Sequence, residues 1–416
     1  MSPAVLALIA LIATLALGMT SRVNVGLLGI ALAWVIGVYA AGMKADAVIA
    51  GFPSGLFITL AGVTFLFAIA KSNGTLDVLT RHATRLVRGD ARLLPVLFFA
   101  IACAISTVGP GAIATVALVA PFAMATGARA RVPYLLSAVM VGTGANAGNL
   151  SPISAVGAMV DGLMAKNGMG GHEWKVWAVN FGAHLLVASL AYVFFGGLKL
   201  AHDGALVETA DAIPPLERRN RVTMAVTAVW IAAVVAWHVN VGLAAFAAGT
   251  LLVLVAAVDE RDVIHRIPLD VLFMVTGVTM LIGVLEATKG MDLFVSMIAR
   301  VATPATLNGV IAFVTGGIST YASTSGVVLP AFLPMAPGLV REVGGGDPLA
   351  VALSINVGSA LVDVSPLSTL GALCVATVAD RTEARDLFRK LLIWGISMTI
   401  AGALLCGLFA GLVARI

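Results

Sequence analysis

Two short polar segments interrupt long apolar stretches and contain residue types that could bind ions. The first is "NLSPIS" at residues 149–154, and the second is "DVSPLS" at residues 363–368. Ser151 and Ser365 lie 214 positions apart. A Ser-Pro pair is typical of a helix start, because serine caps free amides and proline has no amide to lose at the first helical position. We therefore expect each segment to split a buried helix, with Ser151 and Ser365 as the caps.

Glycines upstream of the Ser-Pro pairs are expected to let the preceding half-helices end. They are Gly142, Gly144 and Gly148 in the first copy and Gly358 in the second. Two further polar interruptions, "STVGPG" at 106–111 and "STYASTSG" at 319–326, also lie within apolar stretches. Unpaired backbone is tolerated at membrane depth only where it is buried in protein or lines a water-filled cavity. The four interruptions are therefore expected to meet near the midplane of the membrane.

Side chains at these interruptions suggest an anion site beside a cation site. Half-helix N-termini offer amide donors to carboxylate, while hydroxyls and the opposite helix ends can coordinate sodium. The predicted substrate-binding residues are Ser106, Thr107, Gly109, Ser151, Ser319, Thr320, Ser323, Thr324 and Ser365. The predicted sodium ligands are Thr143, Asn146, Asn149, Asn356, Ser359 and Asp363.

The interruptions contain no lysine or arginine, so a bound dianion would meet only dipoles. Charge balance then favours binding of cations together with the anion. Asp363 is the carboxylate that we place well inside a span, and Asn149 occupies the matching position in the first copy. Two interpretations of Asp363 stay open: a sodium ligand or proton carrier, or a helix cap in a structural polar network.

The composition excludes a soluble protein. Over 416 residues, 60% are hydrophobic and 11% are charged, and the mean hydropathy is +1.03. About ten apolar runs are long enough to span a bilayer, so we expect an all-α polytopic membrane protein. The net charge of +4 is explained by the excess of Lys and Arg in cytoplasmic loops. The three cysteines lack metal-ligand spacing, and no nucleotide-binding motif is present.

The sequence contains an internal duplication. "RVNVGL" at 22–27 recurs as "HVNVGL" at 238–243, and "AGVTFL" at 61–66 recurs as "TGVTML" at 276–281. With "AIST" at 104–107 and "GIST" at 317–320, the matches keep the same order at offsets of 213 to 216. We therefore predict two tandem repeats, 1–200 and 221–416, joined by a cytoplasmic linker at 201–220.

Each repeat is predicted to contain scaffold helices, a hairpin, a broken helix and a final helix. In the first repeat these occupy 3–72, 93–126, 134–162 and 174–198, with an amphipathic interfacial stretch at 75–90. In the second repeat they occupy 222–287, 305–336, 350–378 and 391–413. Basic residues flank the first hairpin at both ends, so both hairpins are expected to be re-entrant.

Five spans remain per repeat, an odd number, so the repeats must be inverted in the membrane. This topology places 18 of the 25 Lys and Arg residues on one face, which we assign to the cytoplasm. Both termini are then extracytoplasmic, in a cytoplasmic membrane.

Other polar and aromatic residues have ordinary interpretations. His184 is either a proton relay or, more simply, a packing residue, and Trp174 and Trp177 fit an aromatic belt. A serine hydrolase that uses "STSG" at 323–326 with His184 lacks a third triad member. Because the triad is incomplete, we expect no enzymatic activity. A channel is also disfavoured, since it would not require two opposed hairpins.

Around the interruptions the sequence resembles the ion transporter superfamily, particularly divalent anion/sodium symporters. These carry a Ser-Asn-Thr motif at each hairpin tip and a broken helix after each hairpin. Segments 24–38, "NVGLLGIALAWVIGV", and 51–77, "GFPSGLFITLAGVTFLFAIAKSNGTLD", look more specifically like the dicarboxylate carrier MatC type. The tips depart from the motif, because they read Ser-Thr-Val at 106–108 and Ser-Thr-Tyr at 319–321, or Ser-Thr-Ser at 323–325. The resemblance implies an elevator-type motion and a homodimer.

These observations predict a secondary active transporter of a small dicarboxylate, malonate or a C4 acid, driven by sodium symport. The alternative is a carrier of the same superfamily for inorganic-anion efflux or sodium/proton exchange. The expected partners are the dicarboxylate and the lipid bilayer, with sodium as coupling ion, no other cofactor and no nucleic acid.

Overall fold

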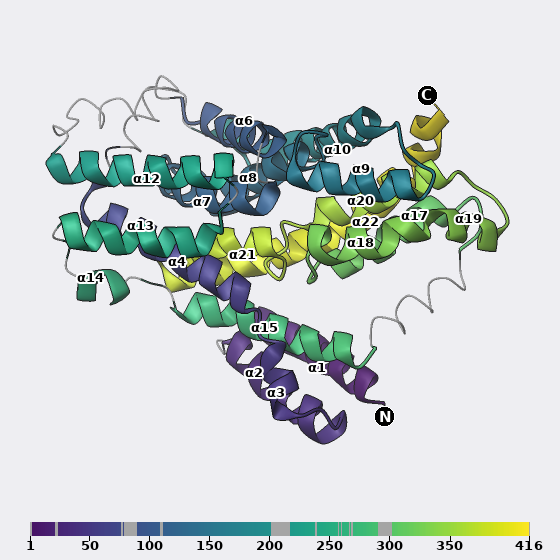
Figure 1. Cartoon of the computed structure of the whole chain (residues 1–416), viewed down its shortest axis with the longest axis horizontal. Helices are drawn as coiled ribbons and strands as arrows, with labels where there is room; N and C mark the ends of the chain where they lie inside the picture. Colours follow the sequence, from purple (N-terminus) through teal and green to yellow (C-terminus); the bar gives the residue numbers. More distant parts are fainter. Residues whose placement is uncertain are drawn as a thin grey trace. The chain divides into compact units, whose positions relative to one another are not determined.

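The computed structural model describes residues 2–20, 24–75, 78, 90–108, 111–200, 217–237, 239–256, 258, 260–265, 267, 269–289 and 302–415. All regular elements in these ranges are helical, in agreement with the predicted all-α fold. By length and composition three helices could cross a membrane: α7 (Ala112–Arg129), α10 (Glu173–Phe194) and α22 (Arg381–Arg415). Eight shorter helices are also apolar. The described chain is thus helical (Figure 1), and its apolar helices are those of a membrane protein.

The chain forms two compact units that each draw on both halves of the sequence. The first unit contains Met1–Phe57, Leu269–Ala372 and Phe388–Ile416. The second contains Ile58–Pro268 and Leu373–Leu387. The compact units therefore do not coincide with the predicted repeats, whose boundaries stay a prediction.

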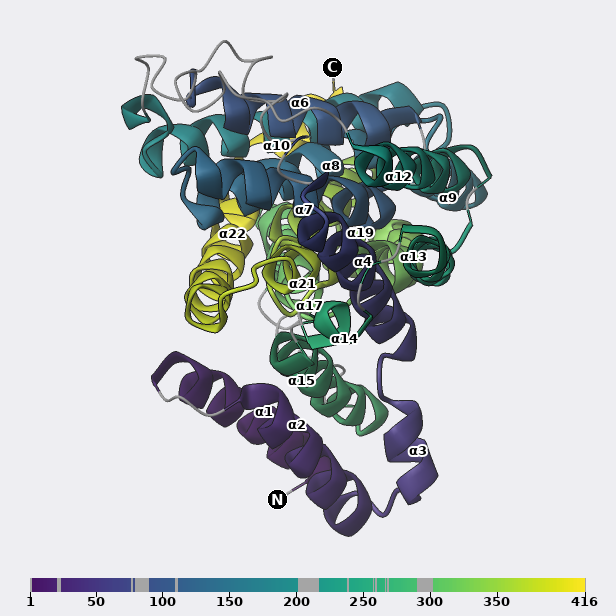
Figure 2. The ribbon, with the colours of Figure 1, turned by 90° about the vertical axis from the view of Figure 1, so that its left-hand side faces the viewer.

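In the first unit, α1 (Pro3–Thr20), α2 (Val25–Trp34) and α15 (Leu269–Ala287) pack together (Figure 2). The chain continues from α2 through a π-helix, η1 (Val35–Ala40), to the short helix α3 (Ala45–Ala50). Glycines allow α2 and α15 to touch through their backbones. A Cβ atom on Gly29 would lie 2.7 Å from the carbonyl oxygen of Gly277, and one on Gly277 would overlap the backbone of Gly26. A larger residue at any of these positions would push the two helices apart.

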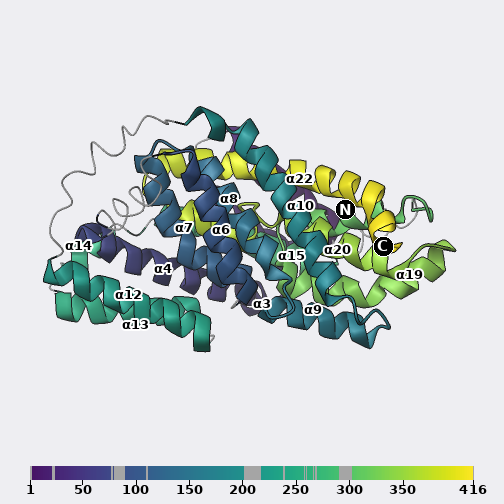
Figure 3. The same ribbon diagram turned by 90° about the horizontal axis from the view of Figure 1, so that it is seen from above.

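In the second unit, α4 (Ser54–Ser72), α12 (Arg218–Trp237) and α13 (Val241–Ala256) form a similar group (Figure 3), followed by α14 (Glu260–His265). A Cβ atom on Gly242 of α13 would lie 2.6 Å from the carbonyl oxygen of Ile58 in α4. One on Gly62 of α4 would overlap the Gly242 carbonyl. The rings of Phe65 and Phe246 pack beside this contact at a tilt of 32°, with centroids 5.9 Å apart.

These two glycine contacts are related by the sequence repeat. Gly26 and Gly242 hold matching positions in "VNVGL", and Gly62 and Gly277 hold matching positions in "GVT". Thus α2 of the first half packs on α15 of the second, while α13 of the second half packs on α4 of the first. The predicted duplication itself stays a prediction. The opposed insertion of the two repeats stays a prediction.

The segments predicted as the first hairpin and the first broken helix each contain two helices in the second unit, while the re-entrant course of the hairpin stays a prediction. The hairpin 93–126 consists of α6 (Leu93–Val108) and α7, and the helix 134–162 consists of α8 (Tyr134–Asn149) and α9 (Ala155–Lys166). Helix α8 packs against α6, α7 and α10, so it lies at the centre of this group (Figure 3). After α10 the chain makes a single 3-10 turn, η2 (Gly197–Lys199).

In the first unit, the second hairpin is less regular than predicted. Its first arm is α17 (Leu307–Ser319), but the second arm is divided into η3 (Thr324–Val328), α18 (Leu329–Phe332), η4 (Leu333–Met335) and α19 (Ala336–Val343). Prolines at 330, 334 and 337 each remove a backbone donor, which explains the π and 3-10 turns. The predicted broken helix 350–378 consists of α20 (Pro348–Val362) and α21 (Thr369–Ala376).

The last helix, α22, begins ten residues earlier than the predicted start at 391. The amides of Thr382 and Glu383 donate to Asp380 Oδ1 at 2.8 and 2.9 Å, so Asp380 caps the helix. Apolar pattern alone did not reveal this polar first part. The stretch 75–90 lies mostly outside the described residues, as does most of the linker 201–220.

The glycine contact between α2 and α15 can be tested by adding one methyl group. We expect Gly277→Ala to destabilise the protein by about 1–3 kcal/mol, because the methyl group would overlap the Gly26 backbone. Gly182→Ala in α10 is the matched control, since nothing lies within 4 Å of its added Cβ. Thermal unfolding in detergent measures both. An unchanged midpoint for Gly277→Ala would contradict the close helix contact.

Candidate functional site

The first helix break is a proline turn closed by two serines. The amide of Ser154 donates to the carbonyl of Ser151 at 2.9 Å, with Pro152 at the second position of the turn. Ser154 then caps α9, because its Oγ accepts from the amide of Gly157 at 2.9 Å. The same hydroxyl donates to the carbonyl of Asn149 at 2.6 Å. The predicted cap, Ser151, is therefore wrong by three residues.

The second break repeats this geometry. The amide of Ser368 donates to the carbonyl of Ser365 at 3.1 Å, and α21 begins at Thr369, directly after Ser368. Ser365 is thus a turn residue rather than the predicted cap of the helix. One difference separates the two copies: Ser368 Oγ donates to the side chain of Asp363, whereas Ser154 donates to a backbone carbonyl.

Each turn is buried against a glycine that the sequence analysis missed. Gly157 and Gly371 follow the second serine by three residues. A Cβ atom on either glycine would overlap the carbonyl of the turn serine, Ser151 or Ser365. The repeated unit is therefore Ser-Pro-x-Ser-x-x-Gly. Comparing the two copies beyond the second serine would have revealed it.

Asn149 connects the first break to the tip of the first hairpin. Its Oδ1 accepts from the amide of Ala112, the first residue of α7, at 2.9 Å, and Asn149 is only 3% exposed. The neighbouring Gly111 has φ +84°, a conformation that favours glycine. The Asn149 side chain therefore supplies the acceptor that this helix start lacks. Its predicted role as a sodium ligand stays a prediction, and Gly109 lies outside the described residues.

The glycines upstream of the breaks allow close packing instead of ending helices. Gly144 lies within α8, where an added Cβ would be 2.5 Å from the carbonyl oxygen of Phe99, and a Cβ on Gly358 would be 2.7 Å from Cα of Ala312 in α17. Gly142 and Gly148 also lie within α8, so the expectation that these glycines end the half-helices is wrong. Close contact with a hairpin arm is what requires a small residue at Gly144 and Gly358.

Four hydroxyls at the site donate within their own helices. Thr107 donates to the carbonyl of Cys103 at 2.7 Å, and Thr320 donates to that of Gly316 at 3.1 Å. Thr143 and Ser359 donate to the carbonyls four residues earlier at 2.5 and 2.6 Å. A hydroxyl has a single proton, so these oxygens offer further partners only lone pairs. That arrangement suits a cation better than a carboxylate.

The tip of the second hairpin is hydrogen-bonded to α20. The hydroxyls of Ser319 and Thr324 are hydrogen-bonded to each other, and Thr324 Oγ1 lies 3.4 Å from the carbonyl oxygen of Ser359. If Thr324 donates to that carbonyl, Ser319 supplies the proton between the two hydroxyls. Ser323 is half-buried beside them.

Two predicted site residues are buried without a hydrogen-bond partner in the described part of the chain. The first is Ser106, which is fully buried and whose Oγ has no partner. The second is Asn356, which is 1% exposed and whose side-chain nitrogen and oxygen both have none. A buried polar group without a partner costs about 1–3 kcal/mol. Ser106 and Asn356 are therefore the strongest candidates for contact with a bound molecule or ion.

The His184 side chain is hydrogen-bonded within its own helix, and this contact supports its interpretation as a packing residue. Its Nδ1 lies 2.8 Å from the carbonyl oxygen of Asn180, so this nitrogen donates. Asn180 in turn donates to the carbonyl of Asn146 at 2.7 Å, which joins α10 to α8 near the first break. Among the described residues, no three His, Cys, Asp or Glu side chains are grouped as a metal site.

The fold and the two breaks define a helical membrane protein with paired helical hairpins and paired discontinuous helices. Residues 1–149 match the family described as "Dicarboxylate carrier protein MatC N-terminus". The MatC-type resemblance predicted from the sequence is confirmed over these residues, which end at Asn149, the last residue of α8. No curated protein matches the chain.

Removal of the two turn serines distinguishes their roles. We expect Ser154→Ala to lower stability by about 1–2 kcal/mol, because it removes the cap of α9 and the bond to the Asn149 carbonyl. Ser151→Ala should cost less than about 0.5 kcal/mol, since its Oγ lies 3.4 Å from its nearest donor, the Ile153 amide. Thermal unfolding of both variants in detergent is the measurement. A larger loss for Ser151→Ala would restore it as the cap.

Proposed function

We propose that the protein is a secondary active transporter of small dicarboxylates, malonate or a C4 acid, coupled to sodium. The observation that carries the proposal is the match of residues 1–149 to the MatC N-terminus. This region covers α1 to α8, and so includes the first hairpin and the first half of a discontinuous helix. The proposal places the protein in the cytoplasmic membrane as an elevator-type homodimer.

Sodium coupling is supported by the chemistry of the breaks. Among the described residues of the two breaks and hairpin tips, Asp363 is the one charged side chain. A dianion would therefore enter without a buried Lys or Arg to neutralise it, at a cost that bound cations remove. Thr143 and Ser359 present hydroxyl lone pairs, and oxygen atoms are the ligands that hard cations prefer.

Ser106 and Asn356 have the polar atoms with which a substrate or ion would pair. A serine hydroxyl can donate to a carboxylate, and a primary amide offers both a donor and an acceptor. Asn356 could then donate to a carboxylate while its oxygen accepts a cation. Removing either side chain should weaken binding without disturbing a hydrogen bond in the described part of the chain.

The proposed activity is tested by uptake into proteoliposomes. We expect labelled malonate or succinate to accumulate when a sodium gradient is imposed, and Asn356→Ala to raise the KM while leaving stability nearly unchanged. Proton and potassium gradients, imposed separately, are the controls. Failure to move any dicarboxylate under any gradient would exclude the proposal. Sodium/proton exchange or anion efflux without dicarboxylate uptake would favour the alternative carriers.

The role of Asp363 is tested by an isosteric change. Asp363→Asn keeps an oxygen that can accept from Ser368, so the turn should remain intact while the charge is lost. We expect the apparent sodium affinity to fall by about tenfold or more, because the ion loses its one charged partner. Sodium dependence of uptake is the measurement.

Ser368→Ala is the control for the turn, because it removes the same hydrogen bond and keeps the carboxylate. An Asp363→Asn variant with unchanged sodium dependence would make Asp363 a structural cap. A proton-coupled carrier would instead show a changed dependence on pH with no response to sodium.

A further inference from the structure

One polar side chain of α10 has an unpaired oxygen beside the end of α8. Asn180 Nδ2 donates to the carbonyl oxygen of Asn146 at 2.7 Å, but Asn180 Oδ1 has no partner in the described part of the chain. Asn180 is 0% exposed. The Asn146 carbonyl accepts hydrogen bonds, so it requires the nitrogen of the Asn180 amide to face it. The oxygen of that amide therefore stays buried without a donor.

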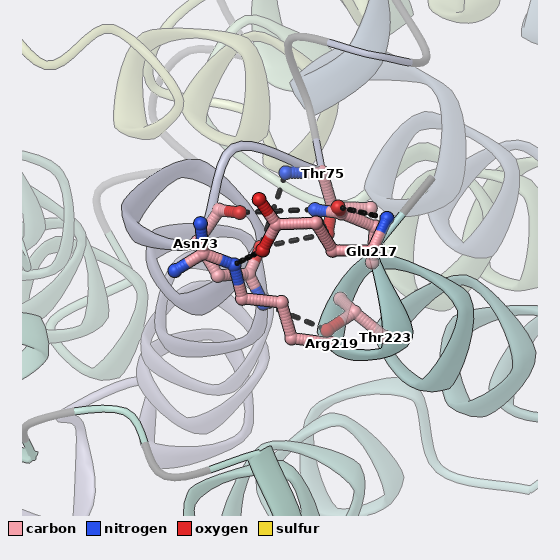
Figure 4. A network of polar contacts seen from close by, with 6 residues as sticks. Asn73, Thr75, Glu217, Arg219 and Thr223 are labelled. Atoms are coloured by element: carbon pink, nitrogen blue, oxygen red, sulfur yellow. Dashed lines mark hydrogen bonds and ion pairs between the residues drawn. The ribbon is translucent and has the colours of Figure 1, made fainter. Parts of the chain in front are cut away.

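Two other buried asparagines of the same unit have both amide atoms paired. Asn73, where α4 ends, donates from Nδ2 to Thr223 Oγ1 and accepts at Oδ1 from the hydroxyl of Thr75, both at 2.7 Å (Figure 4). Asn220 also donates from Nδ2 and accepts at Oδ1. Buried polar groups are normally satisfied in this way, because an acceptor without a donor loses its hydration and gains nothing. Asn180 is an exception that a bound ligand would explain.

The helix end beside Asn180 is electrically negative. Because α8 ends at Asn149, its last carbonyl groups lack the amides that an unbroken helix would supply. The Leu150 amide donates to the Gly148 carbonyl, and the side chain of Asn180 serves the Asn146 carbonyl. The C-terminal end of a helix carries about half a negative charge and favours cations. The unpaired oxygen of Asn180 thus lies where a cation is stabilised.

This place lies on the side of α8 that faces α10, away from the first hairpin. Gly144 and Gly148 of α8 pack closely on α6. Asn146 is two positions from each of them, which places it about 160° around the helix. The contact with Asn180 is therefore separate from Ser106 and Thr107, the predicted substrate-binding residues at the end of α6.

The second copy does not repeat this arrangement. When Trp177 is aligned on Trp394, Asn180 corresponds to Ser397. Ser397 Oγ donates to the carbonyl of Trp394 at 2.8 Å, within its own helix. The second break instead carries the carboxylate of Asp363. The two copies thus offer a cation different groups: an amide oxygen in the first and a carboxylate in the second.

We propose that the side-chain oxygen of Asn180 coordinates a sodium ion at the C-terminal end of α8. The ion would pair the buried acceptor and balance the negative helix end, and oxygen atoms are the ligands that hard cations prefer. Asn146, whose carbonyl accepts from Asn180, is itself a predicted sodium ligand. The inference rests on the proposed sodium coupling and adds to it a ligand from α10.

Thermal unfolding of the full chain in detergent measures this site without substrate or transport. Sodium chloride is titrated at constant ionic strength against choline chloride, with potassium chloride as a second comparison. We expect sodium to raise the unfolding midpoint of the wild type, because an ion that binds the folded state stabilises it. Asn180→Ala should weaken the apparent sodium affinity about tenfold, since it removes a ligand.

Asn180→Asp distinguishes an ion ligand from a simple helix cap. It loses the donor to the Asn146 carbonyl but keeps an oxygen and adds a negative charge. We expect its midpoint to be lower than that of the wild type in choline and to rise more steeply with sodium. Ser189→Ala is the matched control, because the Ser189 hydroxyl donates within α10, to the Leu185 carbonyl. This control should leave the sodium shift unchanged.

The ion site is overturned if sodium does not stabilise the wild type more than choline does. It is also overturned if Asn180→Ala and Asn180→Asp lower the midpoint equally in all three salts, because Asn180 would then only cap α8. The result is separable from the transport proposal. Sodium-dependent uptake with an unchanged sodium shift in Asn180→Ala would refute this site alone, whereas a sodium shift that requires Asn180 would support it even without dicarboxylate transport.

Discussion

The structure depends on one constraint: a helix that breaks inside a membrane must satisfy its free backbone groups with other parts of the protein. Both breaks solve this in the same way. A proline turn reverses the chain locally, a second serine stands at the start of the next helix, and a glycine lets the turn carbonyl pack closely. In the first copy, the Asn149 side chain also satisfies the start of α7. The breaks are thus closed, ordered elements of the fold.

Close backbone packing is the second consequence of the membrane setting. Without a difference in hydrophobicity between helix and lipid, association relies on van der Waals contact and small residues at the interface. Gly148 of α8 approaches the carbonyl of Cys103 in the first hairpin, and in the second copy Gly316 of the hairpin approaches the carbonyl of Gly358 and the side chain of Val362. Both copies therefore use glycine where a hairpin arm packs on a discontinuous helix.

Much of the fold could be predicted because long apolar runs and the internal repeat are strong signals. The predicted scaffold range 3–72 begins with α1 at Pro3 and ends with α4 at Ser72, and the predicted range 222–287 ends with α15 at Ala287. The choice of cap was wrong because Ser151 and Ser154 are both good cap residues, and only the turn hydrogen bond distinguishes them. The early start of α22 was missed because most of its first ten residues are polar.

Side-chain directions at the site could not be predicted from residue type. Thr107 and Thr320 were expected to bind substrate, but their protons point to backbone carbonyls of their own helices. Asn356 has no such local partner, a property that depends on its surroundings in α20 and not on the sequence nearby. Sequence repetition identified the segments that matter, and the hydrogen bonds show which atoms remain available.

The repeats differ where Asn149 uses its oxygen to close a helix start and Asp363 keeps a carboxylate, held by Ser368, in the same position. The central claim is that ligand binding acts on these two breaks. Amide hydrogen exchange of the full chain, with and without sodium and malonate together, tests it most directly. We predict slower exchange in peptides covering 149–157 and 363–371 when both are present. Unchanged exchange in both segments, or protection confined to other helices, would contradict the account.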